Sequence, residues 1–246
     1  MSPDEAMARL RGLGFDDATT AVLFEHFDDA ERRGKLGHGY SRIEWLETLT
    51  DVEPAARPER LVEEDGFERW NGRGALGYLT LRAICDAVLR DPPEQARLVV
   101  AERCFPTGML GHYARLLARG GLVGVLTATS PARLGHPDGG PKLAGTNPLA
   151  IGIPSSEGEP IVVDVSMGEV TYGDVLAGLA SEERLVPFGG EHAHKAFALA
   201  LGLQLLVDSL VTEPGHAAVL LVARPEADPV PELRRRAEGV RLPGGS

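Results

Sequence analysis

The stretch GTNPLAIGIPSSEGEPIVVDV, residues 145–165, contains two short apolar segments separated by a polar turn region. Residues 149–153 and 161–165 have the length and side-chain content of buried strands. The residues between them are Pro, Ser, Glu and Gly, which favour a connection over a helix. We therefore expect the two segments to pair as a hairpin.

Helical and strand patterns alternate in the sequence before this hairpin. A helical pattern from Gly74 precedes the apolar run at 98–101, and a second one, from Leu110, precedes the run at 122–126. Helices that lead into continuous apolar strands are typical of an α/β sheet whose two faces are both covered.

Two further segments complete the predicted core. Residues 196–210 are apolar on nearly every side, which predicts a buried helix, and residues 217–223 predict a last strand. Residues 1–70 show short helical patterns instead and end in the Pro- and Glu-rich stretch 51–65, which we interpret as a solvated connection. We therefore predict an N-terminal helical part, residues 1–70, and an α/β core, residues 71–246.

Composition and charge restrict the classes of partner. The formal net charge is −11 and 43% of the residues are hydrophobic, so the chain can bury a core but would be repelled by nucleic acid and by anionic membranes. The sequence has no apolar run of bilayer length, and its first residues, MSPDEAMARL, lack the order of a secretion signal. We expect a cytoplasmic protein that binds a small molecule, with Cys85 and Cys104 as buried free thiols.

Several common functional motifs are absent from the sequence. No GxGxxG follows a strand and no GxxxxGK[ST] occurs, so neither a Rossmann fingerprint nor a P-loop is predicted. GxSxG and HExxH patterns are also missing, and we predict no metal site. The pair His192 and His194 is interpreted as partly exposed.

Seven short segments carry a family resemblance. In order along the chain they are GHGYSR (37–42), GMLGHYA (108–114), TSP (129–131), GTNPLAI (145–151), DVS (164–166), GG through HK (189–195) and VRLPG (240–244). Their order and spacing resemble the stations SHGxxR, HxGxxGxYA, TSP, GTNPxAI, DMAT, GGxKG and RLPG of the malate/L-lactate dehydrogenase family, which also contains ureidoglycolate dehydrogenases and cyclic-ketimine reductases. The resemblance implies a mixed sheet with helices on both faces, in a fold unlike the Rossmann domain.

The resemblance also implies an activity, a site and a dimer. Family members transfer hydride between NAD(P)H and C2 of a 2-oxo acid or a cyclic 2-imino acid. His38 matches the catalytic histidine, which suits a general acid that titrates near neutral pH, and Asp164 matches the acidic residue that orients the catalytic groups. Arg42 and Asn147 match positions that bind the substrate carboxylate and line the site. The implied cofactor-binding positions are Ser130, Asp164, Val165, Ser166, His194 and Lys195.

Ordinary structural roles remain open for these residues. His38 could cap a turn, Arg42 could be a surface arginine, and Asp164 could cap the turn that follows its strand. His112 lies on an apolar helix and is interpreted as a packed core histidine.

The chain departs from the family pattern at four positions and is shorter than family members. Gly37 stands in place of a serine, Pro106 in place of the second family histidine, Asp174 in place of a lysine, and Ala196 in place of a glycine. Loss of a cation and of an imidazole weakens the case for binding a phosphate-bearing cofactor.

Three functions follow from this mixture of retained and altered residues. The first is an NAD(P)H-dependent oxidoreductase acting on a 2-oxo or cyclic 2-imino acid. The second is a non-redox acid/base enzyme, such as a tautomerase, cyclase or dehydratase, that acts on an amino-acid-like carboxylate without a cofactor. The third is an inactive partner subunit.

Overall fold

A mixed seven-stranded sheet forms the centre of the computed structural model, which describes residues 1–244. The strand order is β1-β2-β3-β9-β4-β7-β8, and the β2–β3 pair is parallel whereas the other neighbouring pairs are antiparallel. The strands are β1 (Glu59–Glu64), β2 (Phe67–Asn71), β3 (Ala96–Glu102), β4 (Val123–Ala128), β7 (Leu149–Ile153), β8 (Ile161–Val165) and β9 (Ala218–Ala223). A separate pair consists of β5 (Leu134–Gly135) and β6 (Lys142–Ala144). The predicted α/β class with a mixed sheet is confirmed.

The hairpin predicted from residues 145–165 forms β7 and β8. Leu149 pairs with Val165 and Ala150 with Asp164 in an antiparallel register. The runs predicted at 98–101, 122–126 and 217–223 correspond to β3, β4 and β9 within one or two residues. The register brings Asp164 to the end of the sheet where β7 begins, which is where the loop from β6 arrives.

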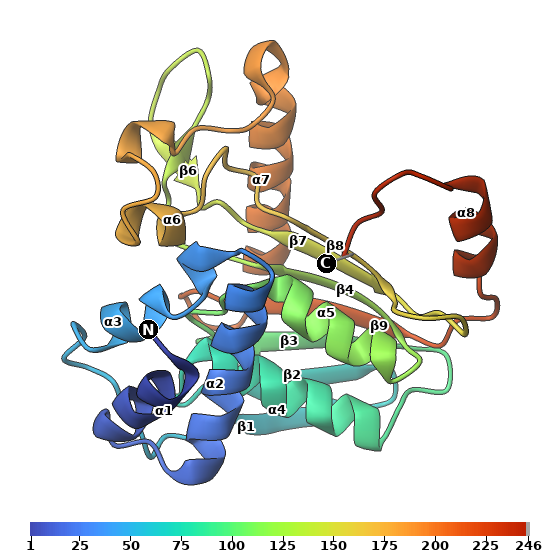
Figure 1. Ribbon diagram of the computed structural model, residues 1–246, viewed down its shortest axis with the longest axis horizontal. Helices are drawn as coiled ribbons and strands as arrows, with labels where there is room; N and C mark the ends of the chain where they lie inside the picture. Colours follow the sequence, from blue (N-terminus) through green and yellow to red (C-terminus); the bar gives the residue numbers. More distant parts are fainter. Residues whose placement is uncertain (245–246) are drawn as a thin grey trace.

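Two helices, α4 (Gly77–Arg90) and α5 (Leu110–Arg119), cover one face of the sheet (Figure 1). Apolar side chains of both helices pack on the strands in the main core; they include Leu81, Ile84, Val88, Tyr113 and Leu117 against Val99, Leu126, Ala150 and Leu220. Cys85 and Cys104 lie in this core as buried free thiols, as predicted.

The N-terminal helices form a further layer over α4 and α5 (Figure 1). They are α1 (Pro3–Gly12), α2 (Asp17–Arg32) and α3 (Ser41–Leu46), with the 3₁₀ turn η1 (Leu36–His38) between the last two. The Asp16 side chain accepts a hydrogen bond from the Thr19 N–H and caps α2, as its sequence predicts. Leu10, Leu23 and Ile43 are fully buried where these helices meet.

The predicted boundary at residue 70 falls inside β2, which is hydrogen-bonded to β3. The interpretation of 51–65 as a solvated connection is wrong for residues 59–64, because they form β1 at the edge of the sheet. Five of the six β1 residues are exposed, so charged side chains are tolerated there and give the strand a linker-like composition. The helical part of the structure therefore ends before Glu59.

Helix α7 (Ala193–Asp208) packs at one end of the opposite face of the sheet. Its Val207 contacts Val100 and Val219 of the sheet, and its Ala200 packs on the small β5–β6 pair. The prediction of a buried helix is correct for one side only, because Leu199, Leu205 and Leu206 are 52%, 59% and 47% exposed. One side of this apolar helix has no partner within residues 1–244.

Short helices complete the chain. They are α6 (Tyr172–Leu176), η2 (Glu182–Arg184), η3 (Gly190–His192) and α8 (Val230–Arg236). Within residues 1–244, we find no helix that combines the length and the apolar character needed to cross a bilayer.

Candidate active site

A cavity of about 310 Å³ lies where the N-terminal helices meet one end of the sheet. Its walls come from η1 and α3, the residues before α5, the loop after β4, the end of β8, and α6. The structure brings five of the predicted site residues to this cavity: His38, Arg42, Ser130, Asp164 and Ser166. This volume lies at the lower end of the range of about 300–1,000 Å³ that is usual for small-molecule sites.

The imidazole of His38 lines the cavity from the last residue of η1. Burial is the main cause that lowers the pKa of His38 to about 4; the positive charges of Arg42 and Lys35 act in the same direction, and the charge of Asp174 opposes them. Its Nδ1 atom is buried and has no hydrogen-bond partner among residues 1–244. The expectation that His38 titrates near neutral pH is therefore not met, and the neutral ring is better suited to accept a proton or hydrogen bond than to donate a proton.

Arg42 is a buried cation that has no carboxylate partner among residues 1–244. Its side chain lies on the second residue of α3 and is 7% exposed. The guanidinium carbon lies 4.0 Å from the centre of the Trp45 ring, and Nε is 3.5 Å from the Tyr78 hydroxyl, the limit of a hydrogen bond. None of the described acidic groups comes within ion-pair distance of it. A buried charge of this kind is costly unless a ligand pairs with it.

Asp164 approaches the cavity from β8 and is held by the first turn of α5. Its Oδ2 accepts a hydrogen bond from the Gly111 N–H at 2.9 Å. Burial raises the pKa of Asp164, and the Gly111 hydrogen bond acts in the opposite direction. A methyl group at residue 111 would lie 2.8 Å from this oxygen, so glycine permits the close approach of helix and carboxylate.

Asn147 is fully buried and does not line the cavity. Its amide nitrogen donates to the Ala200 carbonyl and to Gln204 Oε1, both at 3.0 Å, and its oxygen accepts from the Ser130 N–H at 3.3 Å. Through these hydrogen bonds, the Asn147 side chain connects the loop that contains Ser130 to α7. Its predicted contact with substrate stays a prediction.

The other predicted cofactor-binding residues lie outside the cavity. Val165 is an exposed residue at the end of β8. His194 and Lys195 are exposed on the first turn of α7, and His192 is also exposed. Their roles in cofactor binding also remain predictions.

The cavity is also lined by residues that were not predicted as site residues, among them Lys35, Trp45, Arg133 and Tyr172. The Arg133 guanidinium stacks on the Tyr172 ring, with 3.3 Å from its carbon to the ring centre. Trp45 follows Arg42 by three residues on α3, so helical spacing alone could have placed the two side chains together. Tyr172 and Arg133 lie far apart in the sequence and carry no such signal.

The first turn of α6 packs directly on η1. A methyl group at Gly37 would collide with the Asp174 carboxylate, and one at Gly173 would collide with the Gly37 carbonyl. Asp174 completes a capping box with Thr171, because its N–H donates to the Thr171 hydroxyl oxygen at 3.2 Å and its Oδ2 accepts from the Thr171 N–H at 2.9 Å. The Thr171 hydroxyl also donates to Oδ2 at 2.8 Å. Gly37 and Asp174, two of the departures from the family pattern, are therefore sterically coupled.

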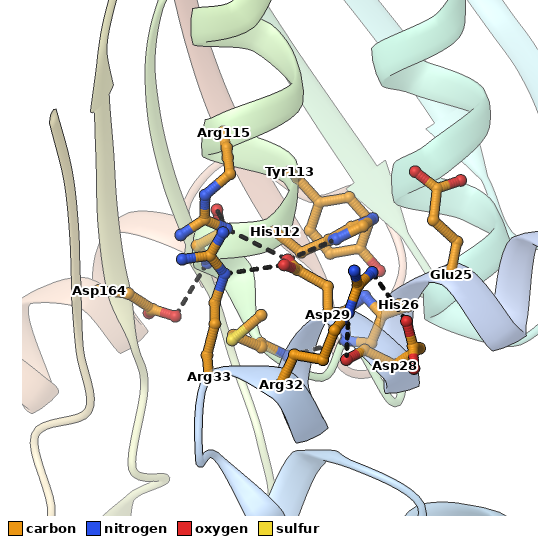
Figure 2. A network of polar contacts seen from close by, with 12 residues as sticks. Glu25, His26, Asp28, Asp29, Arg32, Arg33, His112, Tyr113, Arg115 and Asp164 are labelled. Atoms are coloured by element: carbon orange, nitrogen blue, oxygen red, sulfur yellow. Dashed lines mark hydrogen bonds and ion pairs between the residues drawn. The ribbon is translucent and has the colours of Figure 1, made fainter. Parts of the chain in front are cut away.

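A buried polar network supports the wall formed by α5 (Figure 2). The Asp29 carboxylate of α2 lies 3.0 Å from His112 Nδ1 and accepts hydrogen bonds from Arg33 at 2.7 Å and Arg115 at 3.1 Å. His26 Nε2 accepts the Met109 N–H at 3.1 Å, just before α5 begins. His112 is thus a buried core histidine, as predicted.

Comparisons with known proteins give one consistent result. The sequence profile described as "Malate/L-lactate dehydrogenase" matches residues 4–185. The 2,3-diketo-L-gulonate reductase of Escherichia coli is 30% identical over 185 residues, which are 72% of this chain and 54% of that protein. The chain therefore spans about half the length of the curated relatives that it matches.

Solved structures show the same fold. Malate dehydrogenase from Entamoeba histolytica superposes with a TM-score of 0.82 at 19% identity, covering 100% of this chain and 87% of that one. Δ1-Piperideine-2-carboxylate reductase from Pseudomonas syringae superposes with a TM-score of 0.79 at 24% identity, covering 98% and 89%.

Proposed function

This chain belongs to the malate/L-lactate dehydrogenase family, and from that premise we propose that it is an NAD(P)H-dependent oxidoreductase of a small 2-oxo acid or cyclic 2-imino acid. One observation carries the proposal: the buried guanidinium of Arg42 has no acidic partner within residues 1–244 and lines the same cavity as His38. A substrate carboxylate would supply the missing partner. The planar guanidinium fork can then donate two parallel charge-assisted hydrogen bonds.

Pairing at Arg42 orients the substrate relative to the other groups of the cavity. His38 exchanges a proton or hydrogen bond with the oxygen or nitrogen on C2. The bound carboxylate also offsets the charge of Arg42, one of the causes that lower the pKa of His38. Asp164, held by the Gly111 N–H, lines the same cavity.

The lining residues fit the nicotinamide end of the cofactor. Ser130, Thr146 and Ser166 line the cavity beside Pro131 and Pro148, so hydroxyl groups suited to a carboxamide or ribose lie next to surfaces suited to a flat ring. When bound, the cofactor supplies the hydride that C2 receives.

The phosphates of the cofactor would require cations. Lys35 and Arg133 line the cavity. The distal part of the dinucleotide would extend outside it, toward exposed positions such as His194 and Lys195.

Cofactor titration tests the proposal. We expect NADH or NADPH to bind saturably, measured by the fluorescence of the reduced nicotinamide, and the bound cofactor to be oxidised when a 2-oxo or cyclic 2-imino acid is added. Carboxylate ligands that bind by calorimetry while neither cofactor binds would reject hydride transfer. That result would favour the non-redox acid/base enzyme.

Two observations favour this non-redox enzyme as the second candidate. Asp174 places an anion where the family pattern has a lysine, and Pro106 places a side chain without donors where it has a histidine. His38 and Asp164 could still exchange protons with a carboxylate ligand held by Arg42.

We also propose that the chain forms a homodimer through the exposed side of α7. Leu199 and Leu206 are separated by two helical turns and lie on one stripe, with the exposed Leu205 beside it, an arrangement typical of a helix covered by a partner.

Negative charges introduced on the exposed side of α7 should separate the two subunits of the dimer. We expect the double variant Leu199→Glu/Leu206→Glu to convert a dimer into a folded monomer, measured by light scattering coupled to size-exclusion chromatography. Leu233→Glu, at an exposed leucine of α8, is the control and should leave the mass unchanged. An unchanged dimer in the double variant would place the interface elsewhere.

A further inference from the structure

Near His38, three positions lack the side-chain hydrogen-bond donors of the family pattern. At positions 37, 106 and 174 the chain has Gly, Pro and Asp, and none of these side chains donates a hydrogen bond when Asp is ionised. Pro106 and Asp174 line the cavity, and Gly37 immediately precedes His38. The corresponding family residues, Ser, His and Lys, are all donors.

The Asp174 carboxylate has a fixed orientation. The capping box engages Oδ2 through both donors of Thr171, and the backbones of Gly37 and Gly173 are in contact. The other oxygen, Oδ1, lies against Gly37 and has no hydrogen-bond or ion-pair partner within residues 1–244. One acceptor oxygen is therefore left unpaired next to the His38 turn.

The other cations of the cavity do not neutralise this carboxylate by direct pairing. Arg133 is stacked on Tyr172 and lies 3.9 Å from Glu182, and Lys35 is exposed at the mouth. Arg42 forms no ion pair with Asp174 either, so in the described part of the chain Arg42 and Asp174 are a separated cation and anion in one small cavity.

A separated cation and anion fit a zwitterionic ligand. We propose that the substrate is a carboxylate-bearing cyclic imine bound in its protonated form, with its carboxylate on Arg42 and its N–H directed to Asp174 and His38. The inference rests on the proposed function and selects the imino acid over the 2-oxo acid. His38 assists as an acceptor, because its imidazole is neutral near pH 7.

The chemistry of the two substrate classes differs at this point. Hydride added to C2 of a ketone sends the C=O bonding pair to oxygen, which gains negative charge and must take a proton. Hydride added to C2 of a protonated imine sends the C=N pair to nitrogen, which loses its positive charge and keeps the proton it already has. In both cases the reduced nicotinamide is oxidised as C2 is reduced. A carboxylate next to the reacting group opposes the negative charge that forms on the oxygen of a ketone. The same carboxylate stabilises the positive charge that a protonated imine carries before it is reduced.

Two ligands that differ only in the ring atom test the preference for a protonated imine over a 2-oxo acid by binding alone, without the redox reaction. Proline carries a carboxylate and a ring ammonium, and tetrahydrofuran-2-carboxylate has the same ring with oxygen in place of the ammonium. Measured by calorimetry on the full chain at pH 7, proline should bind at least about tenfold more tightly, since a close charge pair in a protected site contributes roughly 1.5 kcal/mol or more.

Variants assign the preference to Asp174. Asp174→Asn keeps a carbonyl acceptor for the Thr171 N–H and should reduce the ratio of the two affinities to about 1–2 by weakening proline alone. Asp174→Glu, which keeps the charge and suits a capping box, should retain a preference for proline. Asp138→Asn, at an exposed loop residue, removes the same charge elsewhere and should leave the ratio unchanged.

The outcomes separate this inference from the proposed function. If both ligands bind, are weakened by Arg42→Lys, and show no preference that depends on Asp174, the imine assignment is overturned and the carboxylate site stands. If neither ligand binds, or Arg42→Lys changes neither affinity, the carboxylate site itself is rejected, and the imine assignment with it.

Discussion

Arg42→Met should strongly weaken carboxylate binding without destabilising the free chain. Removing one partner of a buried charge pair typically costs about 2–5 kcal/mol, so we expect ligand affinity to fall by roughly 30-fold to 4,000-fold. In the unliganded chain Arg42 is 7% exposed and lacks an acidic partner among the described residues, so a methionine of similar length relieves a desolvated charge. The lost contact with Trp45 acts in the opposite direction and contributes about 0.5–2 kcal/mol.

Calorimetry with a small carboxylate and urea unfolding of the same preparation give the two measurements. The free energy of unfolding of Arg42→Met should equal or exceed that of the wild type. Lys35→Met is the matched control, since it removes a cavity cation that is exposed, and it should weaken binding only a few-fold, less so at high salt. Unfolding that is easier by more than ~2 kcal/mol would identify Arg42 as a structural residue instead, because a larger loss exceeds what its contact with Trp45 can supply.

The core strands could be predicted from the sequence because they are buried. Apolar runs at 98–101, 122–126 and 217–223 form the middle of the sheet, where both faces of a strand exclude water. β1 was missed because an edge strand can keep charged side chains, so Glu59–Glu64 resembles a linker in composition. The apolar sequence of α7 predicted burial correctly on one side only. Its other side has no partner within the described chain.

The candidate site was predictable in part. The resemblance placed His38, Arg42 and Asp164 in one site, and these three residues line one cavity. The low pKa of His38 follows from tertiary burial and the positions of neighbouring charges, which no local pattern contains. Residues 171–174, Thr-Tyr-Gly-Asp, carry a short capping pattern that could have been recognised, and it explains why the Asp174 carboxylate faces its own helix end.

The network on Asp29 explains how a helix from the N-terminal part holds one wall of the site. The carboxylate contacts the side chains of Arg33, which directly follows α2, and of His112 and Arg115 of α5 (Figure 2). Arg115 has one other hydrogen bond, to the Gly111 carbonyl at 3.2 Å, and its side chain is 7% exposed. Because the Gly111 N–H holds Asp164, the same turn of α5 connects the network to the cavity.

Asp29→Ala should therefore be strongly destabilising. It leaves Arg115 buried without its carboxylate, and breaking such a pair costs about 3–5 kcal/mol, a large fraction of the roughly 5–15 kcal/mol that stabilises a typical domain. Urea unfolding at pH 7 measures the loss. Asp86→Ala on α4 removes an exposed helical aspartate from its ion pair with Arg82 and should cost less than about 1 kcal/mol. If Asp29→Ala and Asp86→Ala lowered the free energy of unfolding equally, burial of the network on Asp29 would contribute nothing to stability.

The pH dependence of this loss gives an independent check. Burial raises the pKa of Asp29, but hydrogen bonds from His112 and Arg33 and the charge of Arg115 outweigh it, so the net pKa lies well below the usual value. The contribution of the carboxylate is then complete above its unfolded pKa of about 3.9 and decreases as the pH falls through and below that value. The difference in unfolding free energy between the wild type and Asp29→Ala should be about 1 kcal/mol smaller at pH 3 than at pH 7. A difference that stayed constant or grew toward acid pH would mean that Asp29 is protonated in the folded chain, and the charge network would have to be reassigned.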